Sequence, residues 1–219
     1  MRRIGFLHTS PMHTEPFDRL VVDLAPGCEQ VTVVDEALLD DARRLGGSSP
    51  QVLGAIDRAL DSLSAAGADA IVCTCSTVGG EAERRGTERG LSVLRVDRPM
   101  AEQAVAIGGR IGVVAALEST VEPTTTLIAE VAASRGVDVE VSVWMCDRAW
   151  GRFEVGDIDG YLDSVATVCE AAAGTSDVVV LAQASMADAL HRCSTSVPVL
   201  SSPALAVSFA CGSRHEPRG

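Results

Sequence analysis

The sequence predicts an α/β protein of two pseudo-symmetric lobes, each a short parallel sheet flanked by helices. Short apolar segments alternate along the chain with longer segments whose apolar residues recur at helical spacing, a pattern typical of parallel sheets covered on both faces. Part of the first half is repeated in the second half. With 219 residues, 47% of them apolar and only 3% aromatic, the chain can bury a sizeable core made mostly of aliphatic side chains.

Eight apolar segments are predicted strands because each is short and bounded by polar or turn-forming residues. Four lie in each half of the chain: Ile4–His8, Gln30–Val34, Ala70–Thr74 and Val93–Val96, then Ile111–Ala115, Val137–Val143, Val178–Ala182 and Val197–Leu200. Between them lie predicted helices such as Ser49–Ala66 and its counterpart Ile158–Ala173. In the first of these helices Val52, Ile56 and Leu60 recur every four residues and form one apolar face.

An internal duplication is indicated by blocks that recur in the same order at a nearly constant offset. Arg3-Ile4-Gly5 returns as Arg110-Ile111-Gly112, and the surrounding segments share six identities where chance gives roughly one or two. Asp69 opens an apolar segment that is repeated from Asp177. We therefore expect a first lobe of residues 1–100 together with 204–219, and a second lobe of residues 101–203.

Composition excludes several classes of function. The net charge of −12 and the lack of a basic cluster argue against nucleic acid and against an anionic membrane surface. No segment approaches the roughly 20 apolar residues of a membrane helix, so we expect a cytoplasmic protein. All 18 basic residues are arginine, which excludes a Schiff-base lysine and a lysine-dependent phosphate loop. The cysteine and histidine spacings do not match a zinc site, so no metal is expected.

Polar side chains follow the predicted strands at their carboxyl ends, where parallel α/β sheets bind ligands. They lie in four groups: His8 and Ser10; Cys75, Ser76 and Thr77; Ser119 and Thr120; and Gln183 and Ser185. We take these as the candidate site residues. His8 is either an acid or base of the site or a polar group at the lobe surface.

Cys75 stands where a strand gives way to a predicted helix. Backbone N–H groups and the positive end of the helix dipole stabilise a thiolate at that place. Ser76 and Thr77 offer hydroxyl and N–H groups to a carboxylate. The alternative is a buried, inert thiol, which is the interpretation we prefer for Cys73, deeper in the strand. Cys75 is therefore the expected base or nucleophile.

The Cys75-Ser76-Thr77 motif after an apolar strand, with a counterpart half a chain later, resembles the aspartate/glutamate/hydantoin racemase superfamily. That superfamily includes arylmalonate decarboxylase and maleate isomerase, and the resemblance covers almost the whole chain. It implies a site in the cleft between the lobes, a small carboxylic-acid substrate, no cofactor and a homodimer. By position Cys75 matches the first-lobe cysteine of the racemases, whereas Thr77 and Thr120 match carboxylate-binding positions.

Gln183 matches the second-lobe cysteine and departs from the family pattern. Two-base racemisation needs a proton donor on each face of the substrate, and glutamine does not titrate. One reactive thiol suits a cofactor-independent isomerase or decarboxylase that forms and protonates a carbanion beside a carboxylate. Two alternatives remain open: a two-base amino-acid racemase whose second base is not cysteine, and a non-catalytic protein that binds a small carboxylate.

Overall fold

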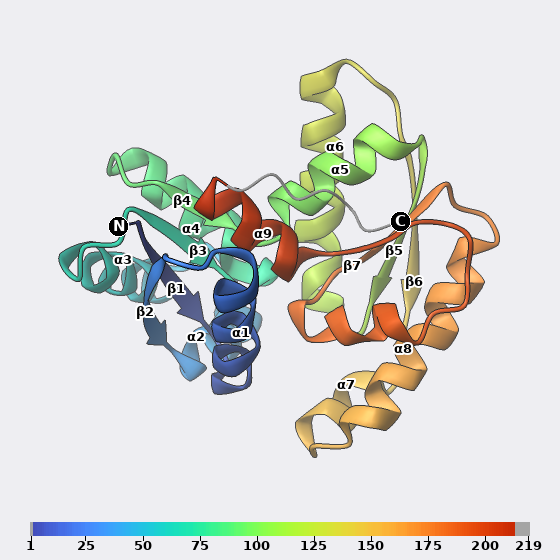
Figure 1. Cartoon of the computed structure of the whole chain (residues 1–219), viewed down its shortest axis with the longest axis horizontal. Helices are drawn as coiled ribbons and strands as arrows, with labels where there is room; N and C mark the ends of the chain where they lie inside the picture. The colour runs from blue at the N-terminus through green and yellow to red at the C-terminus, as the bar shows by residue number, and fades with distance from the viewer. Residues whose placement is uncertain (1, 213–219) are drawn as a thin grey trace. The chain divides into compact units, whose positions relative to one another are not determined.

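The computed structural model describes residues 2–212, so residues 1 and 213–219 of the expected first lobe lie outside it. The chain divides into two compact units, Met1–Val96 with Pro203–Gly219 and Asp97–Ser202. Each unit holds one four-stranded parallel sheet with helices on both faces (Figure 1). The predicted α/β fold class is confirmed. Within the described residues, no helix is both long and apolar enough to cross a membrane.

The first unit is built on a sheet with the strand order β2-β1-β3-β4. Its strands are β1 (Arg3–His8), β2 (Glu29–Val34), β3 (Ala70–Cys73) and β4 (Val93–Arg95). The register pairs Leu7 with Cys73 and Cys73 with Arg95. Because all of these pairs are parallel, the carboxyl ends of β1, β3 and β4 meet at one edge of the sheet.

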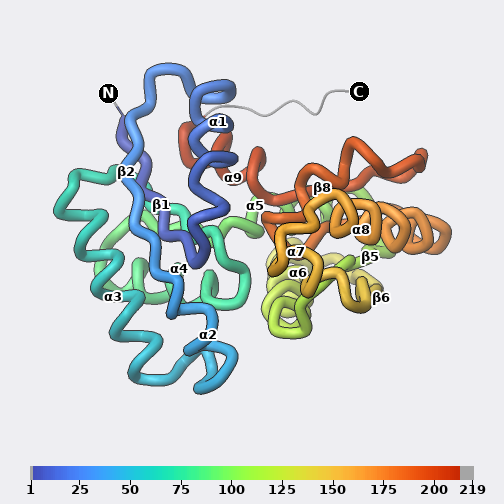
Figure 2. The backbone as a smooth tube through the Cα atoms, turned by 90° about the horizontal axis from the view of Figure 1, so that it is seen from below, coloured from blue at the N-terminus to red at the C-terminus, as the bar shows by residue number. Residues whose placement is uncertain are grey.

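Helices cover both faces of this first sheet. They are η1 (Pro11–His13), α1 (Thr14–Leu24), α2 (Glu36–Leu45), α3 (Pro50–Ala65), α4 (Ser76–Glu88) and α9 (Ser202–Cys211). Leu7 and Cys73 point into a core formed with α2, α3 and α4, whereas Phe6 packs against Phe17 of α1 on the opposite face. Figure 2 likewise shows α1 and α9 on one side of the sheet and α3 on the other.

The second unit repeats this plan with the strand order β6-β5-β7-β8. Its elements are α5 (Arg98–Ile107), β5 (Arg110–Ala115), η2 (Glu118–Thr120), α6 (Val121–Arg135), β6 (Glu140–Met145), α7 (Ala149–Glu154), α8 (Ile158–Ala173), β7 (Val178–Leu181), η3 (Ala184–His191) and β8 (Val199–Ser201). Val114 and Leu181 join the core with α7, α8 and η3. Helices α5 and α6 pack against β7 and β5.

The same backbone-to-aspartate hydrogen bond links the amino ends of the two central strands in each sheet. The backbone N–H of Arg3 donates to Asp69 Oδ2 at 2.8 Å, and that of Arg110 donates to Asp177 Oδ2 at 2.9 Å. Each aspartate comes directly before the third strand of its sheet. The Arg110 side chain also binds Asp177 and holds the pKa of that carboxyl below its usual range. The repeated sequence blocks therefore correspond to a repeated structural contact.

Strand β6 differs from its prediction, Val137–Val143, since it begins three residues later and runs to Met145. The cause is the end of α6, where Gly136 adopts a φ of 65° in the left-handed region. Val137 N–H then donates to the Ala132 carbonyl at 3.1 Å, which closes a Schellman-type cap. The Val137 N–H is therefore bonded to the end of the helix and cannot donate to the neighbouring strand.

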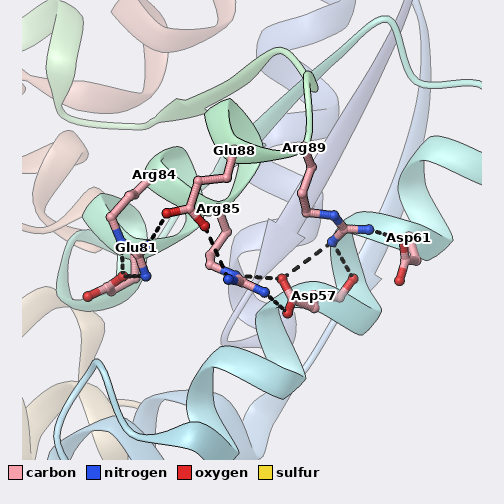
Figure 3. A network of polar contacts seen from close by, with 7 residues as sticks. All are labelled: Asp57, Asp61, Glu81, Arg84, Arg85, Glu88 and Arg89. Carbon is pink, nitrogen blue, oxygen red and sulfur yellow. Dashed lines mark hydrogen bonds and ion pairs between the residues drawn. The ribbon is translucent and has the colours of Figure 1, made fainter.

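Ion pairs join α3 to α4, the helix that follows Cys75 (Figure 3). Arg85 binds both carboxylate oxygens of Asp57, with its Nε 2.9 Å from Oδ1. Arg89 donates to the Asp57 carbonyl at 3.2 Å and pairs with Asp61. Partly exposed pairs contribute little stability one by one, so we infer that this network mainly fixes the orientation of α4 on α3.

Glycine is required at position 86, where α4 crosses β4. An added Cβ at Gly86 would lie 2.2 Å from Val93 Cγ2, well inside van der Waals contact. We expect Gly86→Ala to lower the free energy of unfolding by about 1–3 kcal/mol through overpacking. Chemical denaturation measures this loss.

The matched control is Gly54→Ala in the interior of α3. There the new Cβ meets only Arg58 Nη1 at 3.5 Å, and alanine gains about 0.5–1 kcal/mol of helix stability over glycine. In Gly86→Ala, a second change of Val93 to alanine should recover part of the loss, because it removes the clashing methyl groups. Equal effects of the two alanine substitutions would contradict this account of the packing.

Candidate active-site residues

Cys75 lies at the amino end of α4, two residues after the last residue of β3. It is the N-cap residue of that helix, with an extended backbone at φ −108° and ψ 113°. Its side chain is 8% exposed and packs with Val78 and Ala82 of the same helix. Ser76 and Thr77 form the first turn of α4. The predicted placement of a thiol at a helix start is found here.

Cys73 has a different environment. It is fully buried in β3, and its thiol lies 3.9 Å from the Cys75 carbonyl, to which it donates. Its neighbours Leu7 and Ile71 belong to the apolar core of the first unit. Of the two thiols, Cys75 alone stands beyond the strand, at the edge where side chains can meet a ligand.

His8 ends β1 beside Thr74, and its side chain is 0% exposed. Its Nδ1 lies 2.8 Å from Thr74 Oγ1, and that hydroxyl donates its proton to the Leu7 carbonyl at 3.1 Å. Thr74 must then accept from His8, so the imidazole carries its proton on Nδ1. The other nitrogen, Nε2, is a buried lone pair with no hydrogen-bond partner among the described residues.

Burial keeps the His8 imidazole neutral. The ring stacks on Phe6 with centroids 5.6 Å apart and lies 5.4 Å from Phe17. Loss of solvent lowers the pKa of His8 to about 4, and the nearby His13 adds a smaller effect in the same direction. At neutral pH His8 therefore presents an acceptor at Nε2, not a positive charge.

Ser10 has a local structural task. Its Oγ accepts a hydrogen bond from Met12 N–H at 3.3 Å and so caps the short helix η1. The hydroxyl proton remains able to donate elsewhere, since the capping bond uses only a lone pair. The cap holds the loop that follows His8.

In the second unit, Gln183 takes the place that Cys75 has in the first. Each is the second residue after the third strand and the N-cap of the helix that follows. Gln183 is 6% exposed, and its Oε1 accepts from Ala116 N–H at 2.9 Å. Its Nε2 is buried and has no hydrogen-bond partner among the described residues. The amide oxygen is thus held by the backbone, whereas the amide NH2 group can still donate a hydrogen bond.

The hydroxyl groups predicted in the second unit already have partners. Thr120 Oγ1 donates to the Leu117 carbonyl at 2.7 Å and is left with lone pairs only. Ser185 Oγ lies 2.8 Å from the Tyr161 hydroxyl. Ser119 stands beside Thr120 in η2. Each unit thus brings its own candidates to the carboxyl ends of its strands.

Two residues were missed by reasoning from sequence: Thr74, which sets the His8 tautomer, and Tyr161 of α8, which binds Ser185. The signal for Thr74 was present, because pairing of β1 with β3 places it beside His8. Tyr161 lies in a helix far along the chain from Ser185, and no local pattern joins the two. Tyr161 is fully buried, and a buried tyrosine hydroxyl needs a hydrogen-bond partner, which Ser185 provides.

Replacing Gln183 with methionine tests the amide anchor. Methionine has a similar length and volume but offers the Ala116 N–H only a weak thioether acceptor, so we expect the free energy of unfolding to fall by about 1–2 kcal/mol. Urea denaturation of the two proteins measures this difference. Unchanged stability would mean that the Ala116 N–H finds another acceptor.

Comparison with known proteins identifies the family. The Asp/Glu/Hydantoin racemase family model matches residues 7–210, which is nearly the whole chain. The chain belongs to the Asp/Glu/Hydantoin racemase family. The resemblance inferred from the Cys75 motif and the internal repeat is thereby confirmed.

Solved structures of racemases share the fold of this family member. Aspartate racemase from Picrophilus torridus superposes with a TM-score of 0.75 at 16% identity, over 99% of this chain and 96% of that one. A candidate Asp/Glu racemase from Yersinia pestis gives a TM-score of 0.71 at 17% identity, over 97% of this chain and 98% of that one. A mutant of arylmalonate decarboxylase gives 0.58 at 15% identity, over 99% and 96%. A comparison with curated proteins gives no match.

Proposed function

We propose that this family member is a cofactor-independent isomerase or lyase that moves a proton at the carbon beside a carboxylate of a small acid. Cys75 is the acid, base or nucleophile. The observation that carries the proposal is the position of its thiol, at the N-cap of α4 directly beyond β3. Oriented N–H groups and the positive end of the helix dipole favour a bound carboxylate beside this thiol.

The first turn of α4 supplies the second part of the chemistry. Removing a proton beside a carboxylate places negative charge on the carboxylate oxygens, and fixed hydrogen-bond donors stabilise that charge. We propose that Ser76 and Thr77 of the first unit provide such donors, together with Ser119 and the hydroxyl of Ser10. Thr120 and Ser185 complete the proposed carboxylate-binding group.

Because of Gln183, we propose that a proton is transferred on only one face of the substrate. Gln183 takes the strand-end position of Cys75 in the second sheet, where it offers an amide donor but no titratable proton. A single proton donor suits decarboxylation followed by protonation, or an isomerisation with one nucleophile. We propose that Gln183 orients the substrate by a hydrogen bond from Nε2, and that His8 contributes a neutral acceptor at its own Nε2.

The proposal is tested by incubating the enzyme in D2O with malonates, dicarboxylates, amino acids and hydantoins. NMR follows exchange at the α-carbon, chiral chromatography follows the product, and released CO2 is measured separately. We expect one class to exchange or lose CO2 with one enantiomer predominating. Exchange that leads to a racemate would favour a two-base racemase instead. If none of these acids reacts, the proposal is wrong.

Gln183→Cys is a gain-of-function variant for the same question. It adds a titratable thiol at the position that the resemblance matches to the second-lobe cysteine of the racemases, so proton transfer on both faces of the substrate becomes chemically available. We expect the rate of racemisation to rise relative to the wild type while product selectivity falls. An unchanged enantiomeric ratio would show that this position does not reach the reacting carbon.

A further inference from the structure

A short chain of hydrogen bonds fixes the direction in which His8 can bond. Thr74 directly follows β3, and its backbone N–H donates to the Leu7 carbonyl at 3.0 Å. The Thr74 hydroxyl donates to the same carbonyl at 3.1 Å, while its oxygen lies 2.8 Å from His8 Nδ1. Both protons of Thr74 are thus directed at Leu7, and only hydroxyl lone pairs remain for the imidazole.

Aromatic side chains hold the His8 ring in this orientation. Phe6 stacks on it with an angle of 6° between the ring planes, and the Phe17 ring lies 5.4 Å away. Neither phenylalanine can accept or donate a conventional hydrogen bond, and Nε2 has no partner among residues 2–212. A buried acceptor without a partner costs free energy, which a ligand that donates to it recovers.

This acceptor belongs to the edge of the first sheet at which Cys75 stands. His8 ends β1, and the parallel register pairs Leu7 with Cys73 at the end of β3. Thr74 and Cys75 are the next two residues of the chain. The unpartnered Nε2 and the proposed reactive thiol are therefore carried by neighbouring strands of one sheet.

We infer that Thr74 is a positioning residue that sets the substrate class of the proposed site. By holding His8 as the Nδ1–H tautomer, it makes the site select a small acid whose α-substituent donates a hydrogen bond, such as a hydroxyl or an N–H group. The inference rests on the proposed function, which puts the substrate at this edge. An ether, ketone or carboxylate oxygen would face the Nε2 lone pair with lone pairs of its own and is rejected.

The tautomer is measured first, by 15N NMR of the histidine-labelled full-length protein at neutral pH. Burial lowers the pKa of His8 to about 4, so the ring is uncharged under these conditions. We expect the proton on Nδ1 in the wild type and in Thr74→Ser, and a shift of that proton toward Nε2 in Thr74→Val, which has the shape of threonine but no hydroxyl. The signals of His8 are those absent from His8→Gln. The exposed His191 is the internal reference.

Two probe acids then test the selection, hydroxyacetate and methoxyacetate, which differ only in an O–H or an O–CH3 group. The wild type should bind hydroxyacetate about ten- to a hundredfold more tightly, as followed by titration of the His8 Nε2 signal. In Thr74→Val this ratio should fall by about tenfold, because Nε2–H can donate to the ether oxygen. The bulk of the methyl group is the same in both proteins, so the change in the ratio reports the hydrogen bond. Thr74→Ser should keep the wild-type ratio.

The inference is overturned if wild-type His8 carries its proton on Nε2, if hydroxyacetate leaves the Nε2 signal unchanged, or if Thr74→Val keeps the wild-type tautomer or ratio. Should Thr74→Val fail to fold, the tautomer of the wild type and its preference between the two acids still decide. Neither readout requires turnover. Failure of the proposed function would appear separately, as a protein that discriminates between the probes but exchanges no α-proton in D2O.

Discussion

Replacing Cys75 with serine should slow the reaction of the preferred substrate by about two to four orders of magnitude, the usual contribution of an acid–base group. Serine keeps the size of the side chain at the start of α4, but its hydroxyl is a far weaker acid than a thiol. Exchange of the substrate α-proton in D2O measures the loss. The effect should appear in kcat and not chiefly in KM, because the neighbouring donors remain.

Cys73→Ser is the matched control, since it makes the same chemical change two residues earlier in the chain. Cys73 is buried in β3, so a hydroxyl there is expected to reduce stability while the turnover of the folded fraction stays near that of the wild type. Thermal denaturation of both variants separates folding from chemistry. Equal turnover by Cys75→Ser and the wild type would remove Cys75 from the mechanism.

Acidification should destabilise the protein through His8, by about 3 kcal/mol between pH 7 and pH 4. The pKa of His8 is about 4 in the folded protein, compared with 6.5 in a free histidine. In this interval the unfolded chain binds a proton that the folded chain does not, so stability falls as the pH falls. The stability is at its full value above about pH 6.5, where the His8 imidazole is neutral in both the folded and the unfolded chain. Urea denaturation at a series of pH values measures it.

His8→Gln isolates this effect, because glutamine can still donate to Thr74 Oγ1 but has no titration. The difference between the two stability curves should rise from acid to neutral pH and level off above about 6.5. His13, whose pKa burial also lowers to about 4, is present in both proteins, so the effect of its own burial enters both curves. Parallel curves would show that His8 is solvated in the folded state.

Much of the fold follows from local patterns. Helix α8 was predicted with the bounds that it has, and α3 to within one residue at each end, because aliphatic residues at helical spacing define a single buried face. Strand β6 was misplaced at both ends. Its start depends on how Gly136 terminates α6, and its end on pairing with β5, which continues to Ala115 opposite Met145. Such boundaries depend on partners outside the local sequence.

The candidate site also has a part that the sequence predicts and a part that it does not. Cys75 and Gln183 could be found because the repeat places them at equivalent strand ends. The His8 tautomer could not be found, since it depends on the hydroxyl of Thr74 and on where that hydroxyl sends its proton. Hydrogen-bond partners of buried polar groups are set by tertiary packing, which periodicity does not describe.

The repeated contact between Arg3 and Asp69, and between Arg110 and Asp177, has a consequence for engineering. These contacts secure each sheet at the amino ends of its strands, whereas the residues proposed for chemistry stand at the opposite ends. A library of variants at positions 74–77 and 182–185 does not change either of these arginine–aspartate contacts. Such a library keeps these two contacts while it varies the proposed chemistry, and it costs stability where a varied residue also binds the backbone, as Gln183 does at Ala116.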